Sequence, residues 1–315
     1  MSLPVSSLIG LVQEGLGLSE RDSIPSGHRY VLLHLRLPRT VCAILIGSSL
    51  SVAGAMMQGL FRNPLADPGL LGVSSGAALG AALVIVLGFS LPAVPALTLP
   101  ISAFVGGVIA TIVVMRLSFR GRQASVANML LAGIAINAVF GAGTGLLVYM
   151  SDDEQLRSLT FWTMGSVGGA SWDNVPYVAL FAFLPALVGL RLARDLNALL
   201  LGEAEAQLLG VNVEGLKLLV IVLVCIMVGT SVSLTGMIGF VGLVVPHLCR
   251  LLFGADNRKV ILGSFLLGST LLLTADLVSR VIVAPAELPI GIVTSLIGGP
   301  FFLVLLYRSR ERGGV

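Results

Sequence analysis

Long apolar runs, separated by short polar connections, dominate the pattern of the sequence. A helix needs about 20 mostly apolar residues to cross a bilayer. Nine runs of about that length lie near residues 40–60, 69–89, 95–115, 126–149, 175–191, 217–234, 237–253, 260–279 and 289–307. The pattern predicts an all-α, polytopic protein with nine spans in a single transmembrane domain, residues 1–315. Because few residues separate the sixth run from the seventh, a tight turn is expected at Thr235 and Gly236. Pro246 lies inside the seventh run and predicts a kink or a break there.

The composition supports a membrane protein. Hydrophobic residues make up 56% of the chain and charged residues only 11%, whereas a soluble domain carries about 25% charge. The composition therefore disfavours a soluble enzyme and a disordered chain. The basic residues are scattered between apolar runs, which is typical of topology signals, so no nucleic-acid partner is expected.

The distribution of lysine and arginine gives an orientation. Thirteen of these 19 residues fall on the side that holds the C-terminus, and six on the other. The positive-inside rule makes the C-terminal side cytoplasmic. Nine spans then place the N-terminus outside, although no signal peptide is visible. A further span upstream of Met1 would remove this conflict.

Catalytic motifs are missing from the sequence. The two lysines, Lys217 and Lys259, do not follow a glycine directly, so there is no phosphate-binding loop of the Lys-Ser/Thr type. With three histidines and no HExxH sequence, no metal site, cofactor or catalytic residue is expected. Cys42, Cys225 and Cys249 lie in or beside apolar runs and are interpreted as small core residues.

Three arginines on the outer side oppose the positive-inside trend. Arg36 and Arg39 precede the first run, and Arg280 follows the eighth. The guanidinium fork suits carboxylate partners; the alternative is that each arginine anchors its helix at the membrane interface. Asp276 is a carboxylate within a span, which indicates a functional role by default. Its two interpretations are a pair with Arg280 at i+4 spacing and a lining or gating role.

One acidic segment, residues 198–216, lies on the cytoplasmic side. It combines Glu203 and Glu205 with Leu201, Leu208 and Leu209. A short amphipathic helix of this kind docks into a partner's groove. The alternative is a helix on the membrane surface, where basic residues would be expected instead. Two short helices broken at Gly210 are predicted.

Several motifs together resemble one known family. They are Arg36-Leu-Pro-Arg-Thr40, Gly54 with Met57-Gln58, Asn63-Pro-Leu-Ala-Asp-Pro-Gly-Leu-Leu-Gly72, Phe161-Trp-Thr-Met-Gly-Ser166, Gly239-Phe-Val-Gly-Leu-Val-Val-Pro-His247 and Ala286-Glu-Leu-Pro-Ile-Gly291. In this order, from about residue 30 to 306, they resemble the FecCD-type permeases. These are the membrane subunits of bacterial ABC importers for vitamin B12, ferric siderophores and heme.

The resemblance implies an assembly. Family members have ten helices, with the first expected to precede residue 1 here, and form a homodimer in the bacterial inner membrane. Two cytoplasmic ATPase subunits and a periplasmic substrate-binding protein are the implied partners. By resemblance, Arg36, Arg39 and Arg280 dock the binding protein. The ATPase-coupling residues are Gly202, Glu203, Ala206, Leu209, Gly210 and Val211.

The outer segment most resembles that of heme-type members. Arg157 is a candidate partner for a heme propionate, and Met164 and Asp276 are candidates for the translocation path. Arg157 as a simple anchor is the alternative. A siderophore or vitamin B12 permease remains the second choice, and a proton- or sodium-coupled carrier is the alternative from another class.

Overall fold

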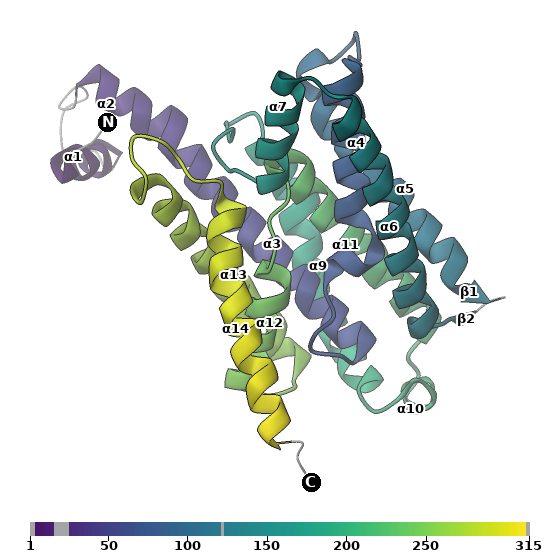
Figure 1. The fold of residues 1–315 in the computed structure, drawn as a ribbon. Coiled ribbons are helices and arrows are strands. Elements are labelled where there is room, and N and C mark those ends of the chain that lie inside the picture. Colours follow the sequence, from purple (N-terminus) through teal and green to yellow (C-terminus); the bar gives the residue numbers. More distant parts are fainter. Residues whose placement is uncertain (1–3, 16–24, 121–122, 313–315) are drawn as a thin grey trace.

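The computed structural model describes residues 4–15, 25–120 and 123–312, and almost all of them are helical (Figure 1). The elements are, in order, α1 (Val5–Gly15), α2 (Ser26–Tyr30), the π-helix η1 (Val31–Arg36), α3 (Leu37–Phe61), η2 (Pro68–Leu71), α4 (Val73–Leu87), η3 (Pro95–Leu97), α5 (Thr98–Ser118), strands β1 (Phe119–Arg120) and β2 (Gln123–Ala124), α6 (Val126–Met150), α7 (Asp153–Met164), α8 (Val175–Val178), η4 (Ala179–Phe183), α9 (Leu184–Leu199), α10 (Glu203–Leu208), α11 (Val213–Thr235), α12 (Val241–Phe253), α13 (Asn257–Val281) and α14 (Ile290–Arg312).

Each of the nine predicted runs falls on a helix, so the all-α, multi-pass class is confirmed. Six helical stretches of the described chain are long and apolar enough to cross a membrane. The other three runs form shorter apolar helices: α4, α12 and the part of α14 from Ile290 to Val304. The antiparallel pair β1–β2 is a small hairpin between α5 and α6.

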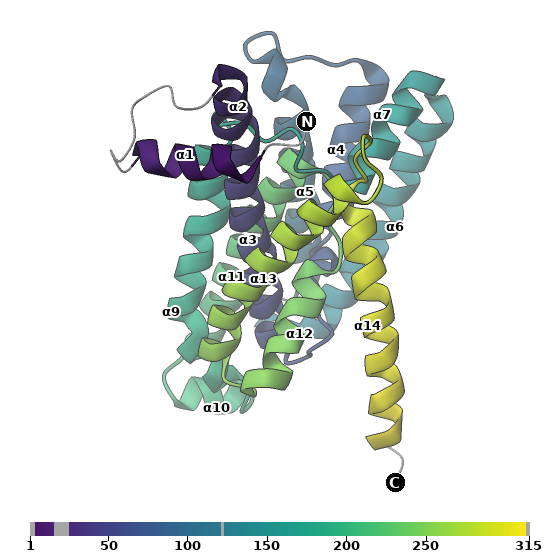
Figure 2. The same cartoon turned by 90° about the vertical axis from the view of Figure 1, so that its left-hand side faces the viewer.

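Helix α3 is the centre of the bundle. Every residue from Ile46 to Phe61 is buried, as expected for a helix that is apolar or small all round. It packs against α9, α11, α12 and α13 (Figures 1 and 2). Two serines of α3 bond to neighbouring backbones: Ser51 Oγ donates to the Ser264 carbonyl (2.6 Å) and Ser49 Oγ to the Ala182 carbonyl (2.9 Å). Small residues and such bonds are typical of packing inside membranes.

Helices α4, α5 and α6 form a second group beside this centre. The outermost, α6, leaves large apolar side chains exposed, including Leu131, Ile134, Val139 and Leu146. Apolar exposure over a whole helix is suited to lipid or to another apolar surface rather than to water.

The two ends of the bundle agree with the predicted orientation. The segment α10, the β1–β2 hairpin and the end of α14 lie at one end, and α2 and α7 at the other (Figures 1 and 2). Arg21 and Arg122, which were counted in the charge distribution, lie outside the described residues.

The turn predicted at Thr235 and Gly236 is confirmed, whereas Pro246 does not break its helix. Residues 236–240 connect α11 to α12 without helix, and Pro246 lies inside α12. The turn needs left-handed backbone at Gly236 (φ 72°), which glycine adopts without steric cost. The three cysteines are buried and free, as predicted for core residues.

Candidate functional site

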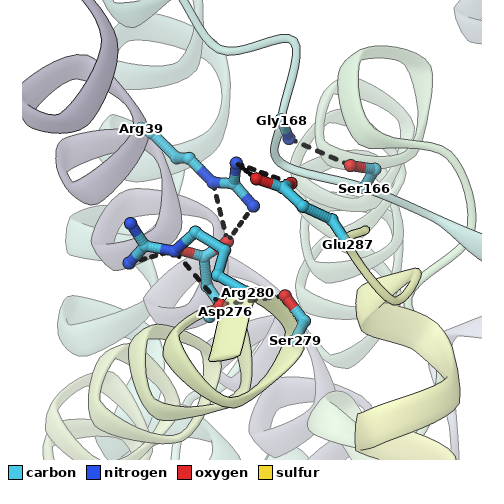
Figure 3. Close-up of polar contacts among 7 residues, drawn as sticks. All are labelled: Arg39, Ser166, Gly168, Asp276, Ser279, Arg280 and Glu287. Carbon is cyan, nitrogen blue, oxygen red and sulfur yellow. Dashed lines mark hydrogen bonds and ion pairs between the residues drawn. The ribbon is translucent and has the colours of Figure 1, made fainter. Parts of the chain in front are cut away.

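Arg39, in the first turn of α3, is held by two carboxylates at the outer end of the bundle (Figure 3). Its Nε donates to Oδ1 of Asp276 at 2.8 Å, and Nη2 lies at the same distance from that oxygen. On the other edge, Nη1 donates to both carboxylate oxygens of Glu287, at 2.9 and 3.1 Å. Charge-assisted bonds of this kind are the strong ones, so the guanidinium is fixed in orientation.

Asp276 sits between two arginines. Its side chain is only 1% exposed, and Nη2 of Arg280 lies 3.1 Å from its Oδ2. Arg280 Nε also donates to the Asp276 backbone carbonyl at 3.3 Å. The i+4 pair predicted from the sequence is therefore confirmed. A buried carboxylate is stable only with such partners, and the geometry favours this holding role over contact with a substrate.

Three chain segments meet at this outer cluster, which comprises Arg39, Asp276, Arg280 and Glu287. Glu287 belongs to the connection between α13 and α14, whose end is tied down because Ile290 N–H donates to the Gly165 carbonyl (2.9 Å). Gly168, after α7, lies alongside: a Cβ atom on it would be 3.6 Å from Nη1 of Arg39. Figure 3 shows these segments converging.

Of the three arginines predicted to dock the binding protein, only two lie in the outer cluster. Arg39 and Arg280 share the outer cluster, while Arg36 is half-buried at the end of η1, one turn before Arg39. Glu287, which faces both Arg39 and the solvent, was not singled out in the sequence. Its only signal was its place in the Ala286–Gly291 motif.

The acidic segment, residues 198–216, carries an exposed leucine patch formed by Leu201, Leu208 and Leu209. Leu208 is 89% exposed, whereas Ala206 on the other face of α10 is fully buried. Left-handed backbone at Gly202 and Gly210 bounds the helix. The prediction of two short helices is wrong in one respect: beyond Gly210 the chain passes directly into α11, since Asn212 caps that helix by accepting from Gly215 N–H.

Lys217 fastens α10 to the bundle. This lysine is buried in the second turn of α11, and its Nζ lies 2.8 Å from a Glu203 oxygen and 3.0 Å from a Glu214 oxygen. Glu203 starts α10, so the pair joins α10 to α11. Sequence reasoning missed this role, although the i,i+3 spacing of Glu214 and Lys217 was a readable signal.

A polar network joins four helices, α3, α9, α12 and α13. Arg250 of α12 donates to Gln58 of α3 (3.3 Å) and Asn257 of α13 (2.9 Å). Asn197 of α9 donates to Asp256 (2.7 Å) and accepts from the Asn257 backbone N–H (2.8 Å). The hydrogen bond from Asn197, followed by that from the Arg258 backbone, lowers the pKa of Asp256 from its ordinary value.

Helix α7 lies largely exposed at the outer end, with Leu159 as its buried residue. A capping box between Asp152 and Gln155 starts it. Arg157, Phe161 and Met164 fall at i, i+4 and i+7, which places them along one face. All three are exposed. In the described part of the chain, no ion pair engages Arg157.

A partly open cavity of about 330 Å³ lies beside the non-helical connection from α11 to α12. Its lining is mostly apolar and includes Val228, Val232, Met237 and Phe240. Phe240 has left-handed backbone (φ 67°), an uncommon conformation for a bulky residue. Among the described residues, no three His, Cys, Asp or Glu side chains lie together as a metal site would require.

An all-α bundle with apolar helices throughout, and with charged groups gathered at its two ends, defines a multi-pass membrane protein. The FecCD transport family pattern matches residues 3–308, nearly the whole chain. The chain therefore belongs to the FecCD transport family. Its members are ABC transporter permeases rather than enzymes, with ATP hydrolysis carried out by a separate subunit, so this chain is an ABC importer permease.

Individual relatives agree with this. The hemin transport system permease protein HmuU of Yersinia pestis is 50% identical over 90% of this chain and 85% of its own. The vitamin B12 import system permease protein BtuC of Vibrio vulnificus is 42% identical over 98% of this chain and 92% of its own. Family membership removes the proton- or sodium-coupled carrier from consideration.

Solved structures share the fold. An inward-facing metal-chelate type ABC transporter superimposes with a TM-score of 0.83 at 36% identity, covering 96% of this chain and 97% of its own. PsaBC from Streptococcus pneumoniae, in complex with Fab, gives a TM-score of 0.61 at 18% identity, covering 88% and 92%; it shows the likeness of fold alone.

Proposed function

We propose that this permease moves heme from the periplasm to the cytoplasm across the bacterial inner membrane. It acts as a homodimer with two ATPase subunits below and a substrate-binding protein above. The assignment of heme as the substrate rests on sequence identity, which is 50% to a hemin permease and 42% to a vitamin B12 permease.

The exposed face of α7 supports heme by its chemistry. Heme combines a flat apolar ring with carboxylates at one edge. Along α7, the Arg157 cation is followed by the aromatic ring of Phe161 and the thioether of Met164. A guanidinium suits a carboxylate, and aromatic and thioether groups suit an apolar ring. Arg157 is therefore assigned to a propionate, and Met164 to the path beside the ring.

The outer arginines are assigned to the docking of the binding protein. Arg39 and Arg280 are oriented by the buried Asp276, and Arg36 is one turn away. Preorganised guanidinium groups bind acidic side chains of a partner without a further ordering cost. Asp276 serves this surface as a support.

The segment 198–216 is assigned to coupling with the ATPase. Glu203 fixes α10 through Lys217, Ala206 packs it against the bundle, and Gly202 and Gly210 form its bends. The leucine patch, which includes Leu209, provides the apolar surface that docks into a partner's groove. Val211 packs against the core behind Gly210.

The homodimer accounts for exposed apolar surface on α6 and α14. Besides the α6 residues, α14 exposes Leu296 and Leu303. A second copy covers such a face in a closed, self-complementary contact, and lipid covers what is left.

Uptake tests the substrate. Cells carrying the permease, its ATPase and its binding protein are supplied in turn with hemin, vitamin B12 and a ferric siderophore. Hemin uptake that requires an active ATPase is expected. The Arg157→Gln variant is expected to raise the hemin concentration for half-maximal uptake, because the propionate loses its cation, while Arg116→Gln on the cytoplasmic side serves as control. Uptake of a different chelate would replace the heme assignment, and uptake without ATPase activity would contradict the importer.

A further inference from the structure

The Arg39 guanidinium has few hydrogen-bond donors left for a partner, because most of its N–H groups already face carboxylates of this chain. Arginine has five N–H donors in a fixed fork. The Nε and Nη2 edge faces Asp276, and Nη1 is engaged by both oxygens of Glu287. A third carboxylate cannot bind this fork through two hydrogen bonds while Asp276 and Glu287 both stay in place.

The two partners of Arg39 differ in how firmly they are held. Asp276 is buried and is shared with Arg280, so removing it would strand a charge in the protein interior. Glu287 is 48% exposed and is held by Arg39 alone among its described ion pairs. Exposed pairs are weak because water solvates both charges. Of the two, Glu287 is the partner that can leave.

The charge balance of the outer cluster also identifies Glu287 as the partner that can leave. The two cations, Arg39 and Arg280, face two carboxylates, Asp276 and Glu287. With Glu287 in place the cluster is neutral, and an acidic partner gains little attraction there. Release of Glu287 leaves one uncompensated cation on the outer surface.

We propose that Glu287 occupies the docking site on Arg39 in the undocked permease, and that an acidic side chain of the substrate-binding protein replaces it there. This rests on the proposed docking function of the outer arginines. Glu287 thus sets how tightly the binding protein docks and lets it leave again.

Replacement of Glu287 on Arg39 also affects the connection between α13 and α14. Glu287 lies three residues before the start of α14, and Ile290 is bonded to Gly165 at the end of α7. Leu288 N–H donates to the Ser279 carbonyl of α13. Movement of Glu287 away from Arg39 therefore loosens one tether of the connection that carries α14, the helix with much exposed apolar surface.

Docking of the purified binding protein to the permease–ATPase complex in lipid nanodiscs tests this. Glu287→Gln is expected to dock roughly two- to fivefold more tightly than the native chain, the size of one exposed ion pair. The gain should shrink at high salt. Glu154→Gln makes the same charge change on an exposed acid of α7, and Glu287→Asp keeps the charge; both are expected to dock like the native chain.

An Arg39→Gln background separates local exchange from the general field. If Glu287 acts through Arg39, Glu287→Gln has no further effect in that background. A gain equal to that of Glu154→Gln, no gain at all, or a gain that persists without Arg39 would overturn the proposal. Failure of the native complex to dock the binding protein, or unchanged docking in Arg36→Glu, would instead overturn the docking function on which it rests.

Discussion

The carbonyl oxygen of Gly242 on α12 lies against the backbone of Gly54 at the centre of α3. A Cβ atom on Gly54 would come 1.7 Å from this oxygen. Proline has no N–H, so Pro246 cannot supply the helical hydrogen bond that Gly242 would otherwise accept. This carbonyl faces a backbone rather than a side chain, and only glycine permits that approach.

Gly54→Ala is therefore expected to destabilise the bundle. Overpacking costs about 1–3 kcal/mol, and here the contacted atom is backbone, which cannot swing aside. The measurement is thermal unfolding of the purified permease in detergent. Gly141→Ala in α6, where nothing lies within 4 Å, is expected to leave the midpoint unchanged or slightly raised. Equal midpoints for the two variants would contradict the close contact.

Lys217→Met is expected to loosen α10 from α11. Glu203 and Glu214 would lose their shared cation, at a cost of about 0.2–1 kcal/mol for each pair because both acids are partly solvated. The expected result is fewer substrate molecules transported per ATP hydrolysed, with complex assembly retained. Lys259→Met removes the chain's other lysine, which is exposed, and serves as the control. An unchanged ratio in Lys217→Met would show that the tether carries no coupling.

Leu209→Asp is expected to uncouple ATP hydrolysis from transport. A carboxylate placed in an apolar groove loses its hydration without gaining a partner. Uptake and hydrolysis measured on the same reconstituted complex check this. Gln207→Asp, on an exposed position of the same helix, controls for added charge. Normal uptake and assembly in Leu209→Asp would rule out docking by the leucine patch.

Arg36→Glu is expected to weaken docking of the binding protein, since an acidic partner then meets a like charge. The loss should be greatest at low ionic strength and should decrease as salt is added. Affinity measured across a salt series checks both points. Salt-independent affinity, identical to that of the native chain, would leave Arg36 as a membrane anchor only.

Asp256, the N-cap of α13, predicts that the stability of the folded chain depends weakly on pH. Because its pKa is lowered in the folded chain, it contributes stability above its unfolded pKa near 3.9. That contribution is lost as pH falls through the lower folded value. Unfolding midpoints measured from pH 6 down to pH 3 should converge for the native chain and Asp256→Asn at the acidic end. Parallel curves would contradict the assignment.

The sequence predicted the features of the fold that depend on the contrast between lipid and water. Apolar runs located the helices because a bilayer requires internally bonded backbone, and the lysine and arginine distribution agreed with the ends at which α10 and α7 lie. The Asp276–Arg280 pair was readable because helical spacing is local. The family motifs then added the candidate docking and coupling residues.

Long-range partners were not readable in the same way. Arg39 and Asp276 are 237 positions apart, and nothing in either segment specifies that they meet. Glu287 and Lys217 acquire their roles only from packing between helices that the pattern treats as independent. The turn at Thr235 and Gly236 was readable from the sequence, whereas the break considered at Pro246 does not occur, since that residue lies inside α12.

The burial of all three thiols has a practical consequence. Cys42, Cys225 and Cys249 lie within the packed bundle, out of reach of water-soluble maleimides. A single cysteine introduced at Ala286, beside Glu287 and exposed, can then carry a spin label or a fluorophore without the native cysteines being removed. Because the native thiols do not react, the label reports only on the connection between α13 and α14, which can then be followed in real time during a transport cycle.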